Sequence, residues 1–402
     1  MGTQIFKSVI TSKGEKPLKT KLHESLEGYL FILPSVVILG VFGLFPVFFT
    51  LFVSLHKWRI KQGRFLGIEN FLEAFGSFAY LAVLIFGIAG LYIGFRLVEA
   101  RHRARSHGVS LLLPVSGVLV LILSAAAIVI SIPQLWDLGD DRMLQSLRVT
   151  IWYSLGSVPV QLALGLLLAV LLDQKFRGKQ IFRVIFLLPY IVPSVAAAAV
   201  FERLFSLRPE SFANQVLLLF GAEPLQWLRE TRGIFTLIAG WGTGKAATTV
   251  GAYWQTWAQG PSLALVSIMF FNYWVYVGYY ALIFANGLSN IPRQLYEAAE
   301  VDGATKVTTF FRITLPLLSP TTYFLTLLGV IGTFKAFNHI YVLRDPSVRG
   351  AADPMSIYIF FTFFRKSRFG YAAAMSLLLL VIVLGLTILQ RRLFEKRIHY
   401  GE

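Results

Sequence analysis

The sequence predicts an all-α, polytopic membrane protein with about eight transmembrane helices, and three observations support that fold class. Of the 402 residues, 56% are hydrophobic and only 14% are charged, whereas a soluble domain usually carries about 25% charged residues. The apolar residues gather in runs of about 20 or more, the length that crosses a bilayer core of about 30 Å. Backbone groups in lipid must pair internally, so these long runs favour helices.

The candidate spans follow one another along the whole chain. The first comes after a polar and basic stretch, and at about 27 residues it is too long for the core of a cleaved signal peptide. We therefore expect it to remain in the protein as a span. The eight predicted spans are residues 29–55, 78–95, 109–132, 149–172, 181–200, 262–285, 317–340 and 371–390.

The distribution of lysine and arginine predicts the orientation of these spans, because cytoplasmic loops are enriched in basic residues. With the N-terminus inside, the inner segments hold 20 of the 37 basic residues, although together they are shorter than the outer segments. This arrangement places both termini and the loop 286–316 in the cytoplasm. The semi-apolar stretch 232–258 is too short for two crossings, and a single crossing would reverse the side of loop 286–316. We expect it to be an extracytoplasmic insert.

These spans and loops divide the chain into five predicted regions. Spans two and three form a hairpin that turns near residues 96–105 and looks inserted. The regions are a cytoplasmic tail at 1–28, a first span with its outer loop at 29–77, the inserted hairpin at 78–138, a core transmembrane domain at 139–390 and a cytoplasmic tail at 391–402.

The most specific pattern lies in loop 286–316 and reads YEAAEVDGATKVTTFFRITLP. Pro292 suits the first turn of a helix, and the residues that follow it are mainly helix formers. Gly303 then permits a turn that other residues resist, and a second helical segment leads into span seven. Two short helices joined at an angle would form a rigid projection. The alternative is an ordinary amphipathic segment at the membrane surface.

This loop resembles the coupling loop of permease subunits in ATP-binding-cassette importers, and the chain looks closest to the carbohydrate branch of that family. Other matching stretches are residues 29–58, 66–71, 149–174 and 182–205. The resemblance implies a type I importer fold with a six-helix core plus the inserted hairpin. It also implies that the loop docks into a groove of an ATPase subunit, where Glu297 would pair with a basic residue. The coupling residues by this resemblance are Glu297, Ala298, Ala299, Asp302, Gly303, Ile313, Leu315 and Pro316.

The resemblance further implies the partners and the cellular location of the chain. It predicts a second, related permease (as a heterodimer), two ATPase subunits and an extracytoplasmic solute-binding protein, in the cytoplasmic membrane of a bacterium or an archaeon. The chain itself would need no cofactor, because ATP and magnesium would bind to the ATPase subunits. One departure from the family is the outer loop after span seven, which lacks the common Gly-Gly-Pro and reads Leu343-Arg344-Asp345-Pro346.

A candidate substrate path lies in spans six and seven. Asn272, Tyr276 and Tyr279 share one helical face, and aromatic rings with polar tips suit sugars. Lys335 is the one charged side chain in the interior of a predicted span, and an intramembrane charge indicates a functional site. The alternatives are aromatic packing and a lysine that extends to the interface. By resemblance to the maltose-type permease, the path would also include Trp274, Phe334 and Asn338.

The composition disfavours several other functions. Cysteine is absent, which excludes disulfides and thiolate chemistry, and the sequence has no complete phosphate-binding loop. The net charge of +16 is explained by basic residues that face membrane lipid rather than nucleic acid. A secondary transporter or a membrane glycosyltransferase is the alternative function. The spans contain no interior acidic residue for a proton relay, and the acidic outer cluster Asp137, Asp140 and Asp141 is the only candidate for transferase chemistry.

Overall fold

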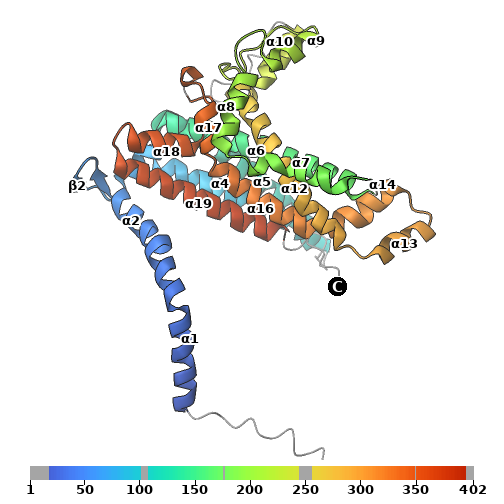
Figure 1. Cartoon of the computed structure of the whole chain (residues 1–402). Helices are drawn as coiled ribbons and strands as arrows, with labels where there is room; N and C mark the ends of the chain where they lie inside the picture. Colours follow the sequence, from blue (N-terminus) through green and yellow to red (C-terminus); the bar gives the residue numbers. More distant parts are fainter. Residues whose placement is uncertain (1–17, 101–106, 175–176, 244–255, 349, 395–402) are drawn as a thin grey trace, which may run out of the picture.

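The computed structural model describes residues 18–100, 107–174, 177–243, 256–348 and 350–394, and these residues are almost entirely helical (Figure 1). Six helical segments are long and apolar enough to cross a membrane, and two bent pairs raise that number to as many as eight. The predicted fold class is therefore confirmed. The six long segments are Gly28–Ser54, Phe78–Glu99, Val115–Leu138, Asp141–Asp173, Leu263–Ser289 and Phe369–Phe394.

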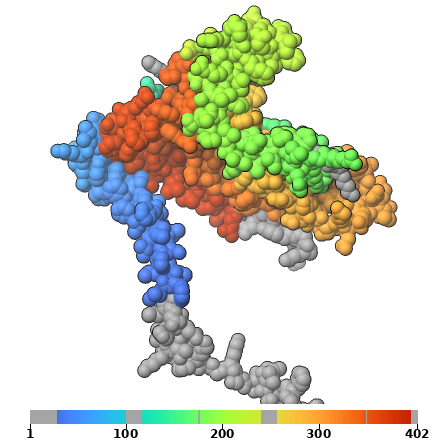
Figure 2. All heavy atoms as spheres, in the orientation of Figure 1, coloured from blue at the N-terminus to red at the C-terminus, as the bar shows by residue number. Residues whose placement is uncertain are grey.

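The N-terminal arm projects away from the rest of the molecule (Figures 1 and 2). Its apolar side chains face outward, with Phe31 87% and Phe42 77% exposed. Only the last part of the arm, α2, contacts the rest of the molecule, where it packs against α19. Lipid or another protein must cover this arm, since an exposed apolar surface of this size is unfavourable in water. The arm consists of α1 (Leu18–Ile38), η1 (Leu39–Leu44) and α2 (Phe45–Ser54), and α19 is Phe369–Phe394.

A small outer structure follows the arm. The antiparallel strands β1 (His56–Trp58) and β2 (Gln62–Phe65) form a hairpin, and α3 (Glu69–Phe75) comes next. The buried side chain of Asn70 donates from Nδ2 to the carbonyl oxygens of Ser54 (2.7 Å) and His56 (3.2 Å). These bonds fix the hairpin on the end of α2.

The helices α4 (Phe78–Ala100) and α5 (His107–Leu138) pack closely against each other. Glycines allow the approach: a Cβ atom on Gly94 would lie 3.0 Å from the carbonyl oxygen of Gly117, and the converse distance is also 3.0 Å. The hairpin joins the core at one end, where Asp140 accepts hydrogen bonds from the hydroxyls of Tyr358 (2.8 Å) and Tyr371 (2.7 Å). The expected turn at 96–105 lies partly outside the described residues.

The centre of the bundle is the pair α6 (Asp141–Asp173) and α12 (Leu263–Ser289). They are in close contact, since a Cβ atom on Gly165 would lie 2.7 Å from the Cβ of Tyr280. The Tyr273 hydroxyl also donates to the carbonyl oxygen of Gly156 at 2.8 Å. The helix α16 (Ser319–Phe334) completes this core by packing on α6 and α19.

Two predicted spans are broken rather than straight. The predicted span 181–200 consists of α7 (Lys179–Ile191) and α8 (Ser194–Leu204), which meet at 93°. Pro193 explains the break, because proline has no N–H for a helix and disfavours helical geometry in the residue before it. Val192 is accordingly extended, with ψ 136°.

The predicted span 317–340 is also different in the structure. Its helix α16 ends at Phe334, so Lys335 follows the helix instead of lying inside it. Before α16, the segment that includes Lys306–Leu317 meets it at a bend of 62°. The remaining helices on this side are α17 (Asn338–Leu343), η4 (Pro346–Val348) and α18 (Met355–Phe364).

A separate lobe extends from α8 and contains α9 (Phe212–Leu219) and α10 (Ile234–Thr243) (Figure 1). The Asn214 side chain organises it, since Oδ1 accepts from Leu225 N (2.9 Å) and Trp227 Nε1 (2.8 Å). The predicted insert 232–258 begins in this lobe, and its residues 244–255 lie outside the described part of the chain.

Candidate functional site

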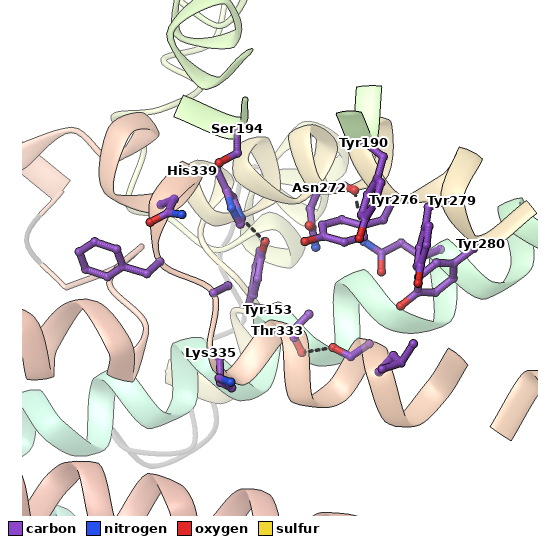
Figure 3. A pocket seen from close by; sticks show the side chains of 17 residues that line it. Tyr153, Tyr190, Ser194, Asn272, Tyr276, Tyr279, Tyr280, Thr333, Lys335 and His339 are labelled. Atoms are coloured by element: carbon purple, nitrogen blue, oxygen red, sulfur yellow. Dashed lines mark hydrogen bonds between the residues drawn. The ribbon is translucent and has the colours of Figure 1, made fainter. Parts of the chain in front are cut away.

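A cavity of about 390 Å³ lies between α6, α7, α12, α16 and the start of α17 (Figure 3). Its size falls within the usual range for small-molecule sites, about 300–1,000 Å³. The residues that line it are mainly aromatic or neutral and polar. They are Tyr153, Gln161, Tyr190, Ser194, Asn272, Tyr276, Tyr279, Tyr280, Leu328, Gly329, Gly332, Thr333, Lys335, Ala336, Phe337, Asn338 and His339.

Tyrosine rings from two helices form one end of this pocket (Figure 3). The ring of Tyr190 on α7 stacks on that of Tyr279 on α12, with centroids 4.3 Å apart and an interplanar angle of 11°. The Tyr276 ring meets Tyr190 edge-on at 5.8 Å. Gly278 makes this contact possible, because a Cβ atom there would lie 1.7 Å from the carbonyl oxygen of Phe186. Because glycine has no side chain, α7 can pack directly against α12.

Polar side chains line the rest of the pocket. The Tyr153 hydroxyl and the Nε2 atom of His339 are hydrogen-bonded at 2.7 Å, and both residues are buried. The side chain of Gln161 donates from Nε2 to the backbone carbonyl of Asn272 at 3.3 Å. The side-chain amide of Asn272 itself has no hydrogen-bond partner among the described residues, so it is available to a ligand.

Lys335 lies away from the tyrosine rings in this view (Figure 3). The lysine is exposed, and no carboxylate of the described residues pairs with it. It follows the last residue of α16, and its backbone N–H bonds to the Ile331 carbonyl oxygen at 3.2 Å. The pocket therefore combines aromatic surfaces and neutral hydrogen-bonding groups with one unpaired cation.

The structure brings most of the residues that the sequence singled out into this pocket. Trp274 is outside the lining and packs against Phe201 of α8, with ring centroids 5.1 Å apart. Phe334 is also outside it and is only 4% exposed. The residues that do line it are Asn272, Tyr276, Tyr279, Lys335 and Asn338.

Several lining residues had no signal in the sequence. Tyr153 and His339 are 186 residues apart, and nothing local to either one indicates the other. Tyr190 lies in an apolar run that predicted only a span. The lining residues that the sequence analysis missed include Tyr153, Gln161, Tyr190, Ser194, Thr333 and His339.

The predicted coupling loop follows the C-terminal end of α12 (Figure 1). Its first helix α13 (Arg293–Val301) ends in a Schellman motif at Gly303, which has φ +72°. The Gly303 N–H donates to the carbonyl oxygen of Glu300 (3.0 Å), and the Ala304 N–H donates to that of Ala299 (2.9 Å). Glycine suits this position because it adopts positive φ without a steric penalty.

The second part of the loop is tied to the first. It contains α14 (Lys306–Thr309), η3 (Phe310–Thr314) and α15 (Leu315–Leu317). The hydroxyls of Tyr296 and Thr314 are hydrogen-bonded at 3.1 Å, so the two parts form one rigid unit.

The predicted coupling residues divide into an exposed group and a packed group. Ala299 is buried, while Ile313, Leu315 and Pro316 are half-buried and pack into the chain. Apolar side chains nearby remain uncovered, with Val301 88% and Val307 66% exposed. This surface suits a protein partner better than water. The exposed predicted residues are Glu297, Ala298, Asp302 and Gly303.

Ion pairs hold the loop after α17, in which the family's Gly-Gly-Pro is missing. Arg229 Nε contacts Asp345 Oδ2 at 2.5 Å, and Arg344 Nε contacts Asp353 Oδ1 at 2.5 Å. Burial raises the pKa of Asp345, but hydrogen bonds from Ser347 and Arg229 outweigh it and hold that pKa below its usual value. The altered loop is therefore held in place by two ion pairs.

The described residues contain no group of side chains that could hold a metal ion. The tyrosine-lined pocket and the loop around Gly303 are joined through α12.

Comparison with protein families gives a match to the model described as "Binding-protein-dependent transport system inner membrane component" over residues 161–400. The chain is 32% identical to the probable ABC transporter permease protein YesP of Bacillus subtilis over 269 residues, covering 65% of this chain and 75% of that protein. It is 27% identical to the trehalose/maltose transport system permease protein MalF of Thermococcus litoralis, covering 92% and 94%.

Two further similarities extend this comparison. The sn-glycerol-3-phosphate transport system permease protein UgpA of Agrobacterium fabrum is 31% identical over 270 residues, covering 66% of this chain and 80% of that protein. A solved bacterial alginate ABC transporter, in complex with an alginate pentasaccharide-bound periplasmic protein, has a chain of similar fold. The TM-score is 0.59 at 17% identity, with 96% of this chain and 100% of that chain covered.

Proposed function

This chain belongs to the family of inner membrane components of binding-protein-dependent transport systems, and we propose that the solute it helps to import is a sugar or an oligosaccharide. The chain is a multi-pass membrane protein and a permease subunit of an ABC importer, not an enzyme. The observation that carries the proposed solute class is the tyrosine-lined pocket with its free amide at Asn272. The relative named for trehalose and maltose supports it.

The proposed pocket suits such a solute on physical grounds. The stacked rings of Tyr190 and Tyr279 offer flat apolar faces for the C–H surfaces of a sugar ring. Asn272, Gln161 and Asn338 offer amides for its hydroxyl groups. Lys335 would favour a heavily hydroxylated or anionic part of the solute. In this proposal these residues form half of a translocation path, and a second permease supplies the other half.

The proposed partners follow from the exposed surfaces. The rigid loop at Gly303 and its apolar neighbours would dock into an ATPase subunit, which binds ATP and magnesium. Closure of the two ATPase subunits would then move α12 and α16 through that loop. The uncovered N-terminal arm supports a second, related permease as a neighbour. An extracytoplasmic solute-binding protein would deliver the solute, and both termini would lie in the cytoplasm.

The assembly can be tested by affinity purification of the full chain from its native membrane in mild detergent, with mass spectrometry of the proteins that accompany it. We expect a related permease and a protein with a complete phosphate-binding loop. A chain that purifies alone, or only with copies of itself, would contradict the proposed assembly.

Substitution of two pocket residues tests the solute path. We expect Asn272→Ala and Lys335→Met each to reduce uptake at low solute concentration by about tenfold, because each variant loses a polar contact to the solute of about 1–2 kcal/mol. Uptake of radiolabelled sugar by cells or proteoliposomes measures this effect. The control is Lys61→Met, which removes a lysine between β1 and β2, away from the pocket. Uptake equal to that of the control in both pocket variants would contradict the assignment of Asn272 and Lys335 to the solute path.

A further inference from the structure

A second cavity, of about 350 Å³, lies at the end of the bundle opposite the loop at Gly303. The start of α6, the loop after α17 and the end of α18 form its walls. It shares no lining residue with the tyrosine-lined pocket. Its lining residues are Arg142, Gln145, Ser146, Arg344, Pro346, Gly350, Asp353, Tyr358, Phe361, Arg365 and Lys366.

Aromatic rings hold the cations of this basic pocket in place. The guanidinium carbons of Arg344 and Arg365 each lie 4.6 Å from the centre of the Phe361 ring. Lys366 lies 4.8 Å from the ring centre of Tyr358 and donates from Nζ to its hydroxyl at 3.3 Å. Stacking of this kind favours cations, and it orders their donor groups before any ligand arrives.

The pocket has more positive than negative charge. Its one carboxylate, Asp353, is occupied by Arg344 through contacts of 2.5 and 3.1 Å. Among the described residues, no carboxylate forms an ion pair with Arg142, Arg365 or Lys366.

Acidic groups next to the lining have other partners. Asp141 accepts from the backbone N–H of Arg142 at 2.8 Å, and Asp345 pairs with Arg229. Asp140 accepts hydrogen bonds from Tyr358, Tyr371 and the backbone at the start of α6, and Glu73 pairs with Arg368. Burial and the neighbouring cations Arg142 and Arg368 lower the pKa of Lys366, although Asp140 opposes this.

The position of the pocket along the helices is that of phospholipid headgroups. Arg142 lies about 10 Å beyond the start of the apolar run 149–172, at 1.5 Å per helical residue. Arg365 and Lys366 lie four and three residues before the start of the apolar helix α19, and the neighbouring side chain of Phe364 is 65% exposed. A basic site therefore lies beside an apolar surface.

We propose that this basic pocket binds an oxyanion of the phosphate class, carried by an anionic lipid headgroup or by a soluble phosphate. Arginine presents paired N–H groups that match phosphate oxygens, and Gln145 and Ser146 add neutral polar groups at the same wall. This inference stands apart from the proposed solute path, because it concerns a different cavity.

The test uses the purified full chain in a neutral detergent. Its unfolding temperature, followed by tryptophan fluorescence, is titrated with short-chain phosphatidylglycerol, with phosphatidylcholine of the same chain length, and with inorganic phosphate. The variant Arg142→Gln/Arg365→Gln removes two unpaired cations and leaves the Arg344–Asp353 pair intact. The control Arg59→Gln/Lys61→Gln removes two charges between β1 and β2, outside the lining.

We expect saturable stabilisation by phosphatidylglycerol, with a Kd raised about tenfold or more in the pocket variant and unchanged in the control. Stabilisation by inorganic phosphate with the same dependence on the two arginines would support a soluble oxyanion as the occupant. Equal effects of the two lipids with none from phosphate, or a Kd unaffected by the pocket variant, would overturn the proposal. A single Arg365→Gln variant keeps the test valid if the double variant does not fold.

Discussion

Replacement of Gly303 by proline is expected to reduce solute uptake to background while the chain still inserts into the membrane. The φ angle of Gly303 is +72°, whereas proline is fixed near −65° and has no N–H. The bond to Glu300 would be lost and the angle between the two helices of the loop would change. The proposed contact with the ATPase would then no longer transmit motion. Uptake and ATPase rates of the reconstituted importer measure the effect.

Gly221 offers a matched control for this experiment. It also has φ +72° and donates its N–H to a carbonyl three residues earlier, that of Leu218, at 3.0 Å. It lies at the end of α9, far from the loop along the chain. Gly221→Pro should keep uptake, and Gly303→Asn should keep part of it, because asparagine tolerates positive φ. Full uptake by Gly303→Pro would contradict a coupling role for this turn.

The second large effect is expected from Gly278→Ala. The added Cβ would lie 1.7 Å from the carbonyl oxygen of Phe186, which is a backbone atom and cannot turn away. We expect a loss of about 3 kcal/mol of stability from overpacking and a separation of Tyr190 from Tyr279. The unfolding temperature of the purified chain should fall, and the KM for uptake should rise.

Gly385→Ala is the control for this substitution, since a Cβ on Gly385 meets no atom within 4 Å. It adds the same methyl group to a membrane helix without a contact. If the two variants unfold at the same temperature, the close contact between α7 and α12 is not a feature of the protein in solution.

Much of the fold could be predicted because its signals are local. The length of each apolar run alone identified the spans, and all eight correspond to helices or bent pairs in the structure. The break at Pro193 was harder to predict from the sequence, since the apolar run continues through it. Whether a proline kinks a membrane helix or divides it depends on what packs alongside, and here α12 supplies a glycine at 278. The division into five regions stays a prediction.

Only those site residues that lie together on one helix could be predicted from the sequence. The shared face of Asn272, Tyr276 and Tyr279 follows from helical periodicity, whereas Trp274, which was included by resemblance, lies outside the pocket lining. The contact between Tyr153 and His339 depends on the packing of α6 against α17. No spacing in one sequence records such a pairing, so seven of the twelve polar lining residues could not be anticipated.

The α4–α5 hairpin has a consequence for the order in which the protein is made. Its glycine contacts join residues close in the sequence, whereas α6 must wait for α12, which begins 90 positions after the end of α6. Contacts over short separations form early because little chain entropy opposes them. The hairpin can therefore be complete in the membrane before the core exists, whereas its attachment at Asp140 forms late, once Tyr358 and Tyr371 have been synthesised.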